Sequence, residues 1–456
     1  MLMRNVVLAV LAITALIAGA GWYAVSLLMP PVAAAGNADP VQATLATHFL
    51  DHLDAGRYDD ALAMATPRLR EGLSGGKLAA TWDTLPKQLG ARTGRSAVRG
   101  EIVEGQPILT ATLVFPMMPL DARITFDEGN RVAGFWVVPA RAAAPAVASA
   151  PTRGEGWHEV DFTVGSGAEA LPATLSLPDG AGPFPAIVLV HGSGSHDRNE
   201  TIGPNAPFRD LAHGLAARGI AVLRYEKRNR VQPQRYAGRA YTLDDETTDD
   251  ALAAVAALRT RAEIDAARVF VAGHSLGALA APRIGRRDPA IAGLILLAGP
   301  ALPLEDTVVR QTRHLLALDG KSAAEIDAAV AALESQRDAI KHIAADMPGD
   351  APSLLGLPTA YWRDLAGYDP VAIASTLTQP LLVLQGGRDY QVTVADDFAR
   401  WRAAFAQDPR VQLREYPLLG HAFMPGGDPP GPKDYLEAGH VDATVIADIA
   451  AWVDAH

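Results

Sequence analysis

Ser275 stands between two glycines in the stretch VFVAGHSLGALAAPRIG. The residues before Gly273 are typical of a buried strand, and those after Gly277 are rich in alanine and leucine, as in a helix. A sharp strand-to-helix turn forces its central residue to positive φ and brings the residues two places away so close that a Cβ would clash. The pattern therefore predicts a strained turn that exposes the Ser275 hydroxyl as a nucleophile, with the Leu276 N–H close to the atom it attacks.

A serine hydroxyl is a weak nucleophile and needs a base. The G-x-S-x-G turn is typical of the α/β-hydrolase fold, in which an acid and then a histidine follow the serine along the chain. Asp389 comes directly after the apolar run in PLLVLQGGRDY, and His421 lies in a loop after the last strand-like run, in VQLREYPLLGHAFMP. We therefore expect His421 to be the base and Asp389 to orient it. Asp396 and Asp397 are the nearest alternative acids, but they lie inside a helical pattern.

A second backbone donor is expected after the first long apolar strand, in LVHGSGSHDRNE. The glycines there allow backbone N–H groups to face a developing negative charge. The Ser193 N–H is the expected partner of the Leu276 N–H in this oxyanion hole, and Gly194 is the alternative donor. His191 is interpreted as a loop-packing residue. The stretch lacks the ending of a phosphate-binding loop, so we do not expect it to bind nucleotides.

From residue 157 onward, short apolar strands alternate with helical patterns, which predicts a mostly parallel sheet covered on both faces. A segment of about 80 residues, 300–379, separates the apolar runs IAGLILLAG and QPLLVLQGG. This segment is too long for a plain crossover between two strands. We expect a helical cap there, with one helix starting at the capping box Ser322-Ala-Ala-Glu325. Tyr361 and Trp362 of this cap, with Phe423, are expected to line an apolar substrate cleft; alternatively, the two cap aromatics only attach the cap to the sheet.

Residues 40–139 predict a small α+β domain, because helical patterns are followed by alternating strand patterns around a turn. Residues 140–156 are rich in Pro, Ala and Gly and predict a linker. Residues 1–35 contain a 24-residue apolar run from Val6 to Met29, and AAAG follows it as a possible cleavage site. We expect either a cleaved signal peptide or an uncleaved anchor, so that the rest of the chain lies in the periplasm or outside the cell.

Composition limits the partners of the chain. The net charge is −11, which gives no indication of a nucleic-acid partner. The chain has no cysteine, which excludes disulfides, thiolate metal sites and a cysteine nucleophile. We expect no metal and no membrane contact beyond the N-terminal segment, and the pattern does not indicate an oligomeric state.

Residues 157–456 resemble bacterial α/β-hydrolases of the esterase and serine-aminopeptidase-like group. The resemblance rests on HGSGSHDRNETIGPN, RGIAVLRYEKR, GHSLGALAAPRI and YWRDLAGYDP with PLLVLQGGRDYQV. Residues 40–139 resemble the DUF3887 domain, with a cystatin- or NTF2-like shape, that precedes some bacterial hydrolases. The first resemblance implies the Ser275, Asp389 and His421 triad and no cofactor.

Three functions remain open. The leading one is hydrolysis of small-molecule carboxylic esters by a serine hydrolase. The second is hydrolysis of amides or peptides by the same triad, for which Glu200 could bind a free amino group, although a solvated loop carboxylate is its simpler interpretation. The third is a non-catalytic binding module of the cell envelope.

Overall fold

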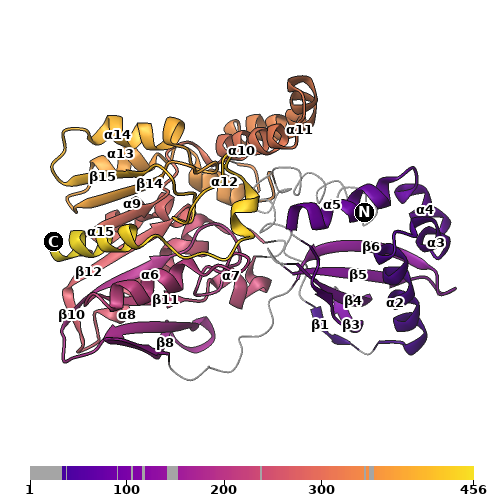
Figure 1. The fold of residues 1–456 in the computed structure, drawn as a ribbon, viewed down its shortest axis with the longest axis horizontal. Coiled ribbons are helices and arrows are strands. Elements are labelled where there is room, and N and C mark those ends of the chain that lie inside the picture. The colour runs from indigo at the N-terminus through magenta and orange to yellow at the C-terminus, as the bar shows by residue number, and fades with distance from the viewer. Residues whose placement is uncertain are drawn as a thin grey trace. The chain divides into compact units, whose positions relative to one another are not determined.

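A computed structural model describes the chain at residues 33–36, 38–89, 91–103, 106–115, 119–140, 152–236, 239–343, 346–348 and 354–456. The chain divides into two compact units, Met1–Ala143 and Ala144–His456, and each is described by itself (Figure 1). The expected signal peptide or anchor, apart from its last three residues, lies outside the described residues. Within the described ranges, no helix is long and apolar enough to cross a membrane.

The first unit packs helices against one face of an antiparallel sheet (Figure 1). Its helices are α2 (Pro40–Asp54), α3 (Tyr58–Ala63), α4 (Pro67–Leu73) and α5 (Lys77–Leu89). Its strands are β1 (Ala33–Gly36), β2 (Gly94–Arg95), β3 (Arg99–Val103), β4 (Gln106–Val114), β5 (Leu120–Phe126) and β6 (Val132–Pro139). The strand order is β1-β3-β4-β5-β6, with β2 paired to β4.

The core of this unit follows the expected patterns. Phe49 and Leu53 on α2 are buried with Phe135 of β6, and the rings of Phe49 and Phe135 meet edge to face. The region is a separate domain of helices and strands, as expected. Strand β1 was not anticipated: its four small residues, which the sequence offers as a possible cleavage site, pair with β3.

The second unit is built on a nine-stranded sheet in the order β15-β14-β13-β12-β10-β11-β9-β8-β7. Strands β10 to β15 are parallel, and β7, β8 and β9 extend one edge in antiparallel pairing. The strands are β7 (Arg153–Gly154), β8 (Trp157–Val164), β9 (Leu171–Pro178), β10 (Phe184–Val190), β11 (Ala221–Tyr225), β12 (Ile264–His274), β13 (Leu294–Leu297), β14 (Leu381–Gly386) and β15 (Val411–Tyr416). This is the mostly parallel sheet that the sequence predicts, except that β7 already begins within the expected linker.

Helices cover both faces of the sheet (Figure 1), as its central parallel strands β10, β13 and β14 require with their buried, mostly apolar residues. Helices α6 and α15 share one core with β10, β11 and β12. Helices α8 and α9 contact β12, and α13 packs against α9 and α14. The bounds are α6 (Pro207–Ala216), α7 (Arg228–Val231), α8 (Asp249–Leu258), α9 (Leu276–Arg287), α13 (Pro370–Ser375), α14 (Ala399–Phe405) and α15 (Ala443–Asp454), with short helical turns at Gly167–Glu169, Pro233–Arg235, Asp244–Thr248, Val394–Phe398 and Pro432–Tyr435.

The insertion between β13 and β14 is helical, as expected. It contains α10 (Leu304–Leu318), α11 (Ala323–Lys341) and α12 (Thr359–Leu365), and α10 and α11 form a hairpin of two long helices (Figure 1). The capping box at Ser322 and Glu325 is present at the start of α11. The insertion ends earlier than expected, because α13 packs in the helical layer of the sheet rather than in the cap.

Candidate active site

Ser275 occupies the turn between β12 and α9 with φ 52° and ψ −114°. Its N–H donates to the Leu297 carbonyl at 2.9 Å, which anchors the turn to the neighbouring strand β13. A Cβ on Gly273 would lie 2.2 Å from the Gly277 carbonyl oxygen, and one on Gly277 would lie 2.1 Å from the Val190 carbonyl oxygen. Both glycines are therefore required by close backbone approach, for the reason that the sequence predicts.

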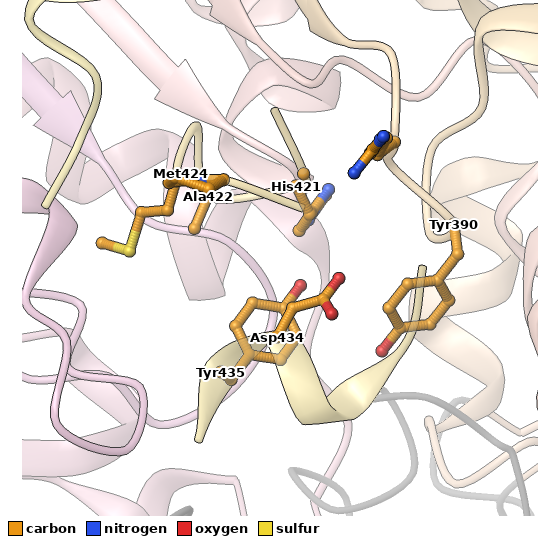
Figure 2. A pocket seen from close by; sticks show the side chains of 9 residues that line it. Tyr390, His421, Ala422, Met424, Asp434 and Tyr435 are labelled. Carbon is orange, nitrogen blue, oxygen red and sulfur yellow. The ribbon is translucent and has the colours of Figure 1, made fainter. Parts of the chain in front are cut away.

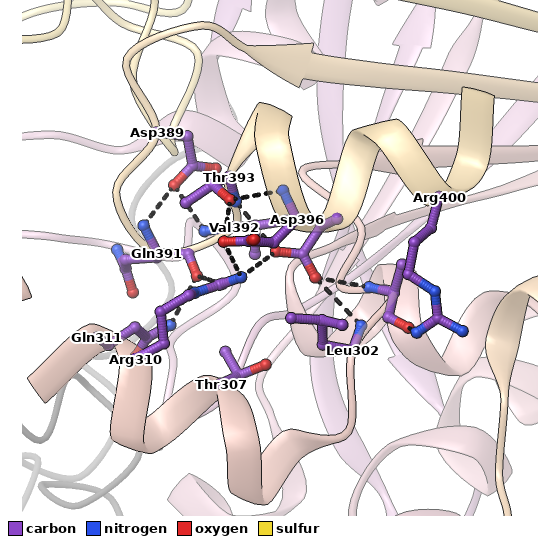
Figure 3. Close-up of polar contacts among 12 residues, drawn as sticks. Leu302, Thr307, Arg310, Gln311, Asp389, Gln391, Val392, Thr393, Asp396 and Arg400 are labelled. Carbon is purple, nitrogen blue, oxygen red and sulfur yellow. Dashed lines mark hydrogen bonds and ion pairs between the residues drawn. The ribbon is translucent and has the colours of Figure 1, made fainter. Parts of the chain in front are cut away.

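Asp389 and His421 meet directly in the loops that follow β14 and β15. His421 Nδ1 lies 2.7 Å from Asp389 Oδ2, and the Asp389 side chain is fully buried. Asp389 Oδ1 accepts hydrogen bonds from the backbone N–H groups of Gln391 and Val392, at 2.8 and 2.9 Å (Figure 3). These bonds fix the carboxylate, so its second oxygen is held toward the imidazole.

The two alternative acids have other partners. Asp397 accepts a hydrogen bond from the Ala301 N–H at 2.9 Å and forms an ion pair with Arg310 of α10 at 2.8 Å. Asp396 contacts Arg310 and the Thr393 hydroxyl (Figure 3). Both carboxylates therefore tie the start of the helix after β14 to α10, and Asp389 is the acid that reaches the histidine.

Strained backbone gathers around the elbow. Four of the five non-glycine residues with positive φ in the described part of the second unit lie in loops after β10, β12, β13 and β15; they are Glu200, Ser275, Ala298 and Phe423. The carboxyl ends of parallel strands meet at one edge of a sheet. Strain of this kind persists only where the surrounding structure enforces it, and it clusters at functional sites.

The histidine loop touches the elbow through His274, the residue before Ser275. His274 Nε2 donates to the His421 carbonyl at 3.1 Å, and the two imidazole rings lie 4.7 Å apart. The Asp389–His421 pair is thereby attached to the residue that precedes Ser275.

The expected oxyanion donors border the same turn. A Cβ on Gly192 would lie 3.3 Å from the Ser275 Cβ, so the loop after β10 runs beside Ser275. Among the described residues, the N–H groups of Ser193 and Leu276 donate no hydrogen bond, and neither does that of the alternative donor Gly194. These N–H groups are thus available to bind a negatively charged oxygen.

Glu200 is deeply buried, which corrects its interpretation as a solvated carboxylate. Only 1% of the residue is exposed; Oε1 accepts the Gly192 N–H at 2.6 Å, and Oε2 lies 2.9 Å from His274 Nδ1. Burial alone would raise the pKa of Glu200, but the facing His274 and the neighbouring His196 and His191 lower it to about 2. Burial lowers the pKa of His274 and Glu200 raises it, and the net effect is upward. The charged pair links the loop after β10 to the turn at Ser275.

We expect Glu200→Gln to lower the free energy of unfolding by about 3–5 kcal/mol near pH 6, because His274 would stay buried without its carboxylate. The part of the free energy of unfolding that comes from the Glu200 carboxylate is fully present above its ordinary pKa of 4.5 and is lost as pH falls toward about 2. The part that comes from the His274 imidazolium is fully present below pH 6.5, the ordinary pKa of histidine, and is lost as pH rises through the raised pKa of His274. Urea unfolding of both proteins should therefore differ most between pH 4.5 and 6.5; a difference under about 1 kcal/mol in this window would contradict the ion pair.

A pocket opens beside His421 (Figure 2). Tyr390, Met424 and Tyr435 give it an apolar lining, and Tyr435 is held by a hydrogen bond from Gln391 at 2.6 Å. The lining residues are Arg388, Tyr390, Gly420, His421, Ala422, Met424, Pro425, Asp434 and Tyr435. Sequence reasoning missed Tyr390 and Tyr435 as pocket residues, although Tyr390 directly follows Asp389 and so could have been found.

The three residues expected to bind substrate are not in this lining. Tyr361 and Trp362 on α12 are almost fully buried; the Tyr361 hydroxyl donates to Glu246 at 2.9 Å, and Trp362 Nε1 donates to the Leu354 carbonyl at 2.7 Å. Phe423 packs in the core between the sheet and α15. Tyr361 thereby joins α12 to the turn Asp244–Thr248, whereas the Trp362 bond lies within the cap.

We expect Trp362→Ala to act on stability rather than on substrate choice. Truncating a buried tryptophan costs about 3–5 kcal/mol, so the melting temperature should fall. The ratio of kcat/KM between short and long acyl esters should stay within about threefold, because the indole lies outside the pocket lining. A changed ratio across an acyl-length series, with the melting temperature preserved, would restore Trp362 as a specificity residue.

Comparison with known proteins adds independent information. A model of the alpha/beta hydrolase family matches residues 187–431, and a model of the DUF3887 family, whose function is unknown, matches residues 46–135. Esterase EstD from Thermotoga maritima is 36% identical over 405 residues, which cover 89% of this chain and 93% of that protein. Among solved structures, Est1E from Butyrivibrio proteoclasticus is 16% identical with a TM-score of 0.41, covering 65% of this chain and 99% of that chain. A putative dienelactone hydrolase from Klebsiella pneumoniae is 19% identical with a TM-score of 0.40, covering 66% of this chain and 99% of that chain.

Proposed function

Because the chain belongs to the α/β-hydrolase family and is an esterase-type hydrolase, we propose that it cleaves carboxylic esters through a covalent acyl-enzyme on Ser275. Ser275 is the nucleophile, His421 the general base and Asp389 the carboxylate that orients the imidazole. The observation that carries the proposal is the strained serine turn beside a histidine whose Nδ1 is bound by a buried, doubly anchored carboxylate.

In the first step, Ser275 Oγ attacks the ester carbonyl carbon, and His421 Nε2 accepts the hydroxyl proton. The carbonyl oxygen becomes an oxyanion, which the Ser193 and Leu276 N–H groups stabilise. Asp389 stabilises the imidazolium that forms. His421 then returns the proton to the departing alkoxide, and the alcohol leaves behind an acyl group on Ser275.

In the second step, water attacks the acyl carbon while His421 accepts one of its protons. The second tetrahedral intermediate collapses, the proton passes to Ser275 Oγ, and the carboxylic acid is released. The protein is restored, and no other co-reactant is consumed.

Ester hydrolysis is favoured over the aminopeptidase alternative by the position of Glu200. An aminopeptidase of this type would need an accessible carboxylate for the substrate amino group. Glu200 was the residue considered for this role, but both of its oxygens face groups of the protein, Gly192 and His274.

Parallel assays with a p-nitrophenyl ester and an aminoacyl p-nitroanilide test this preference. We expect kcat/KM for the ester to exceed that for the anilide by at least about 10³-fold. Faster hydrolysis of the anilide would replace the ester proposal with the peptidase alternative.

We also propose that the protein works outside the cytoplasm, on the strength of the apolar run at residues 6–29. Fractionation of bacterial cells that express the full chain should recover the esterase activity in the periplasmic, membrane or extracellular fraction. Recovery in the cytosolic fraction would contradict this location.

A further inference from the structure

A lysine that the mechanism does not use is buried behind the oxyanion loop, which comprises residues 192–194. Lys227 follows β11, and only 2% of its side chain is exposed. Its Nζ donates to the Gly192 carbonyl at 2.7 Å and to Glu246 Oε1 at 2.7 Å. A buried ammonium costs several kcal/mol unless it is paired, and here Glu246 and the Gly192 carbonyl both bind it.

The bond to the Gly192 carbonyl determines the direction of the next N–H. In a planar trans peptide, the C=O and the following N–H point in opposite directions. The peptide between Gly192 and Ser193 is trans. An ammonium that holds the Gly192 oxygen therefore turns the Ser193 N–H away from Lys227, and this N–H is one of the proposed oxyanion donors.

The next two carbonyls of the loop are held in the same manner. His196 Nε2 lies 2.6 Å from the Ser193 carbonyl oxygen and must carry a proton to bind it. Asn229 Nδ2 donates to the Gly194 carbonyl at 3.2 Å. Three consecutive carbonyls thus each bind a buried side-chain donor, which prevents any peptide of the loop from flipping.

Glu246 holds this set of donors together from the opposite side. Its Oε1 accepts from Lys227 and, at 3.4 Å, from Asn229, while its Oε2 accepts the Tyr361 hydroxyl at 2.9 Å. Tyr361 belongs to α12, so the cap helix supports the oxyanion loop through Glu246. This gives Tyr361 a role that differs from lining the substrate cleft.

We propose that Lys227, assisted by Asn229 and held by Glu246, is a positioning residue for the oxyanion hole: it fixes the Gly192–Ser193 peptide with its N–H directed at the reacting carbonyl. The inference rests on the proposed ester hydrolysis. Since an oxyanion forms only in the transition state, loss of this positioning should lower kcat and leave KM nearly unchanged.

The test is the double variant Lys227→Met/Glu246→Gln, which removes both charges and so leaves no unpaired buried ion. We expect kcat for a p-nitrophenyl ester to fall about 10²-fold with KM within threefold, as for a misplaced catalytic group. A trifluoromethyl ketone, which forms an oxyanion on the serine, should bind more weakly by a similar factor. The matched control is Arg259→Met/Asp288→Asn, which removes a partly buried ion pair of the same unit, with N–O distance 2.5 Å, that lies outside the loop, α12 and the turn carrying Glu246.

The control should lower the melting temperature to a similar degree and keep kcat within threefold. A folded Lys227→Met/Glu246→Gln protein with wild-type kcat would overturn the inference, as would equal losses of kcat in both double variants. If the Lys227→Met/Glu246→Gln protein does not fold, Asn229→Leu replaces it, because this change introduces no charge. Asn229→Leu should lower kcat about tenfold at constant KM, and an unchanged kcat would overturn the inference. Wild type and Ser275→Ala are assayed in parallel; an inactive wild type or an active Ser275→Ala would instead refute the ester mechanism itself.

Discussion

Ser275→Ala should lower kcat for a p-nitrophenyl ester by about 10⁴-fold or more, because the variant lacks the oxygen that forms the acyl-enzyme. The substitution removes one atom and leaves the strained turn and its bond to Leu297 in place. Steady-state kinetics with purified protein measures the loss. The melting temperature should stay within a few degrees of the wild type, since the hydroxyl makes no bond on which the core depends.

Ser195→Ala provides the matched control for this serine. Ser195 is exposed and lies on the loop beside the nucleophile, so the same chemical change there should leave kcat within about threefold of the wild type. A Ser275→Ala protein that keeps more than a tenth of the wild-type rate would refute the nucleophile assignment.

Asp389→Asn should be nearly as damaging, with kcat reduced about 10⁴-fold. The reason lies in the two backbone N–H groups of Gln391 and Val392 that donate to Oδ1. In the variant, the amide oxygen must accept these bonds, so the amide nitrogen takes the place of Oδ2 opposite His421. Two donors would then face each other, and His421 would shift to the tautomer that cannot accept a proton from Ser275.

The neighbouring carboxylate at Asp396 is the control for this charge change. Asp396 is half exposed and contacts Arg310 and Thr393, so Asp396→Asn should keep kcat within about threefold. A mild effect of Asp389→Asn together with a large effect of Asp396→Asn would mean that the catalytic acid has been misassigned.

The elements nearest the proposed chemistry could be predicted because local rules determine them. Gly273 and Gly277 are demanded by backbone distances of about 2 Å, and the apolar runs predict buried parallel strands wherever they occur. Asp389 and His421 follow such strands directly. Strand β8 was missed because it is partly exposed near the edge of the sheet, where the apolar pattern is weaker. Strand β9 was missed although it is almost fully buried, because proline, threonine and serine interrupt its apolar residues.

The surroundings of the site could not be read from the chain, because burial of polar residues depends on tertiary packing. Glu200 lies in the polar stretch SHDRNE and looks solvated, yet it is paired with His274 from a strand 74 residues away in the chain. Lys227 lies between glutamate and arginine in RYEKR, with nothing local to indicate that it is buried. Trp362 illustrates the same limit, because the sequence pattern around an aromatic residue in a cap is the same whether its side chain lines a cleft or packs against a neighbouring element.

Covalent labelling with a fluorophosphonate tests the central claim most directly, because the reagent forms a stable bond only with an activated serine. The full-length protein is incubated with the reagent, digested and analysed by peptide mass spectrometry, with Ser275→Ala and Asp389→Asn treated in parallel. We expect one equivalent of label on the peptide that contains Ser275, slow labelling of Asp389→Asn, and none of Ser275→Ala. Label on a different serine, or none on the active wild type, would contradict the mechanism.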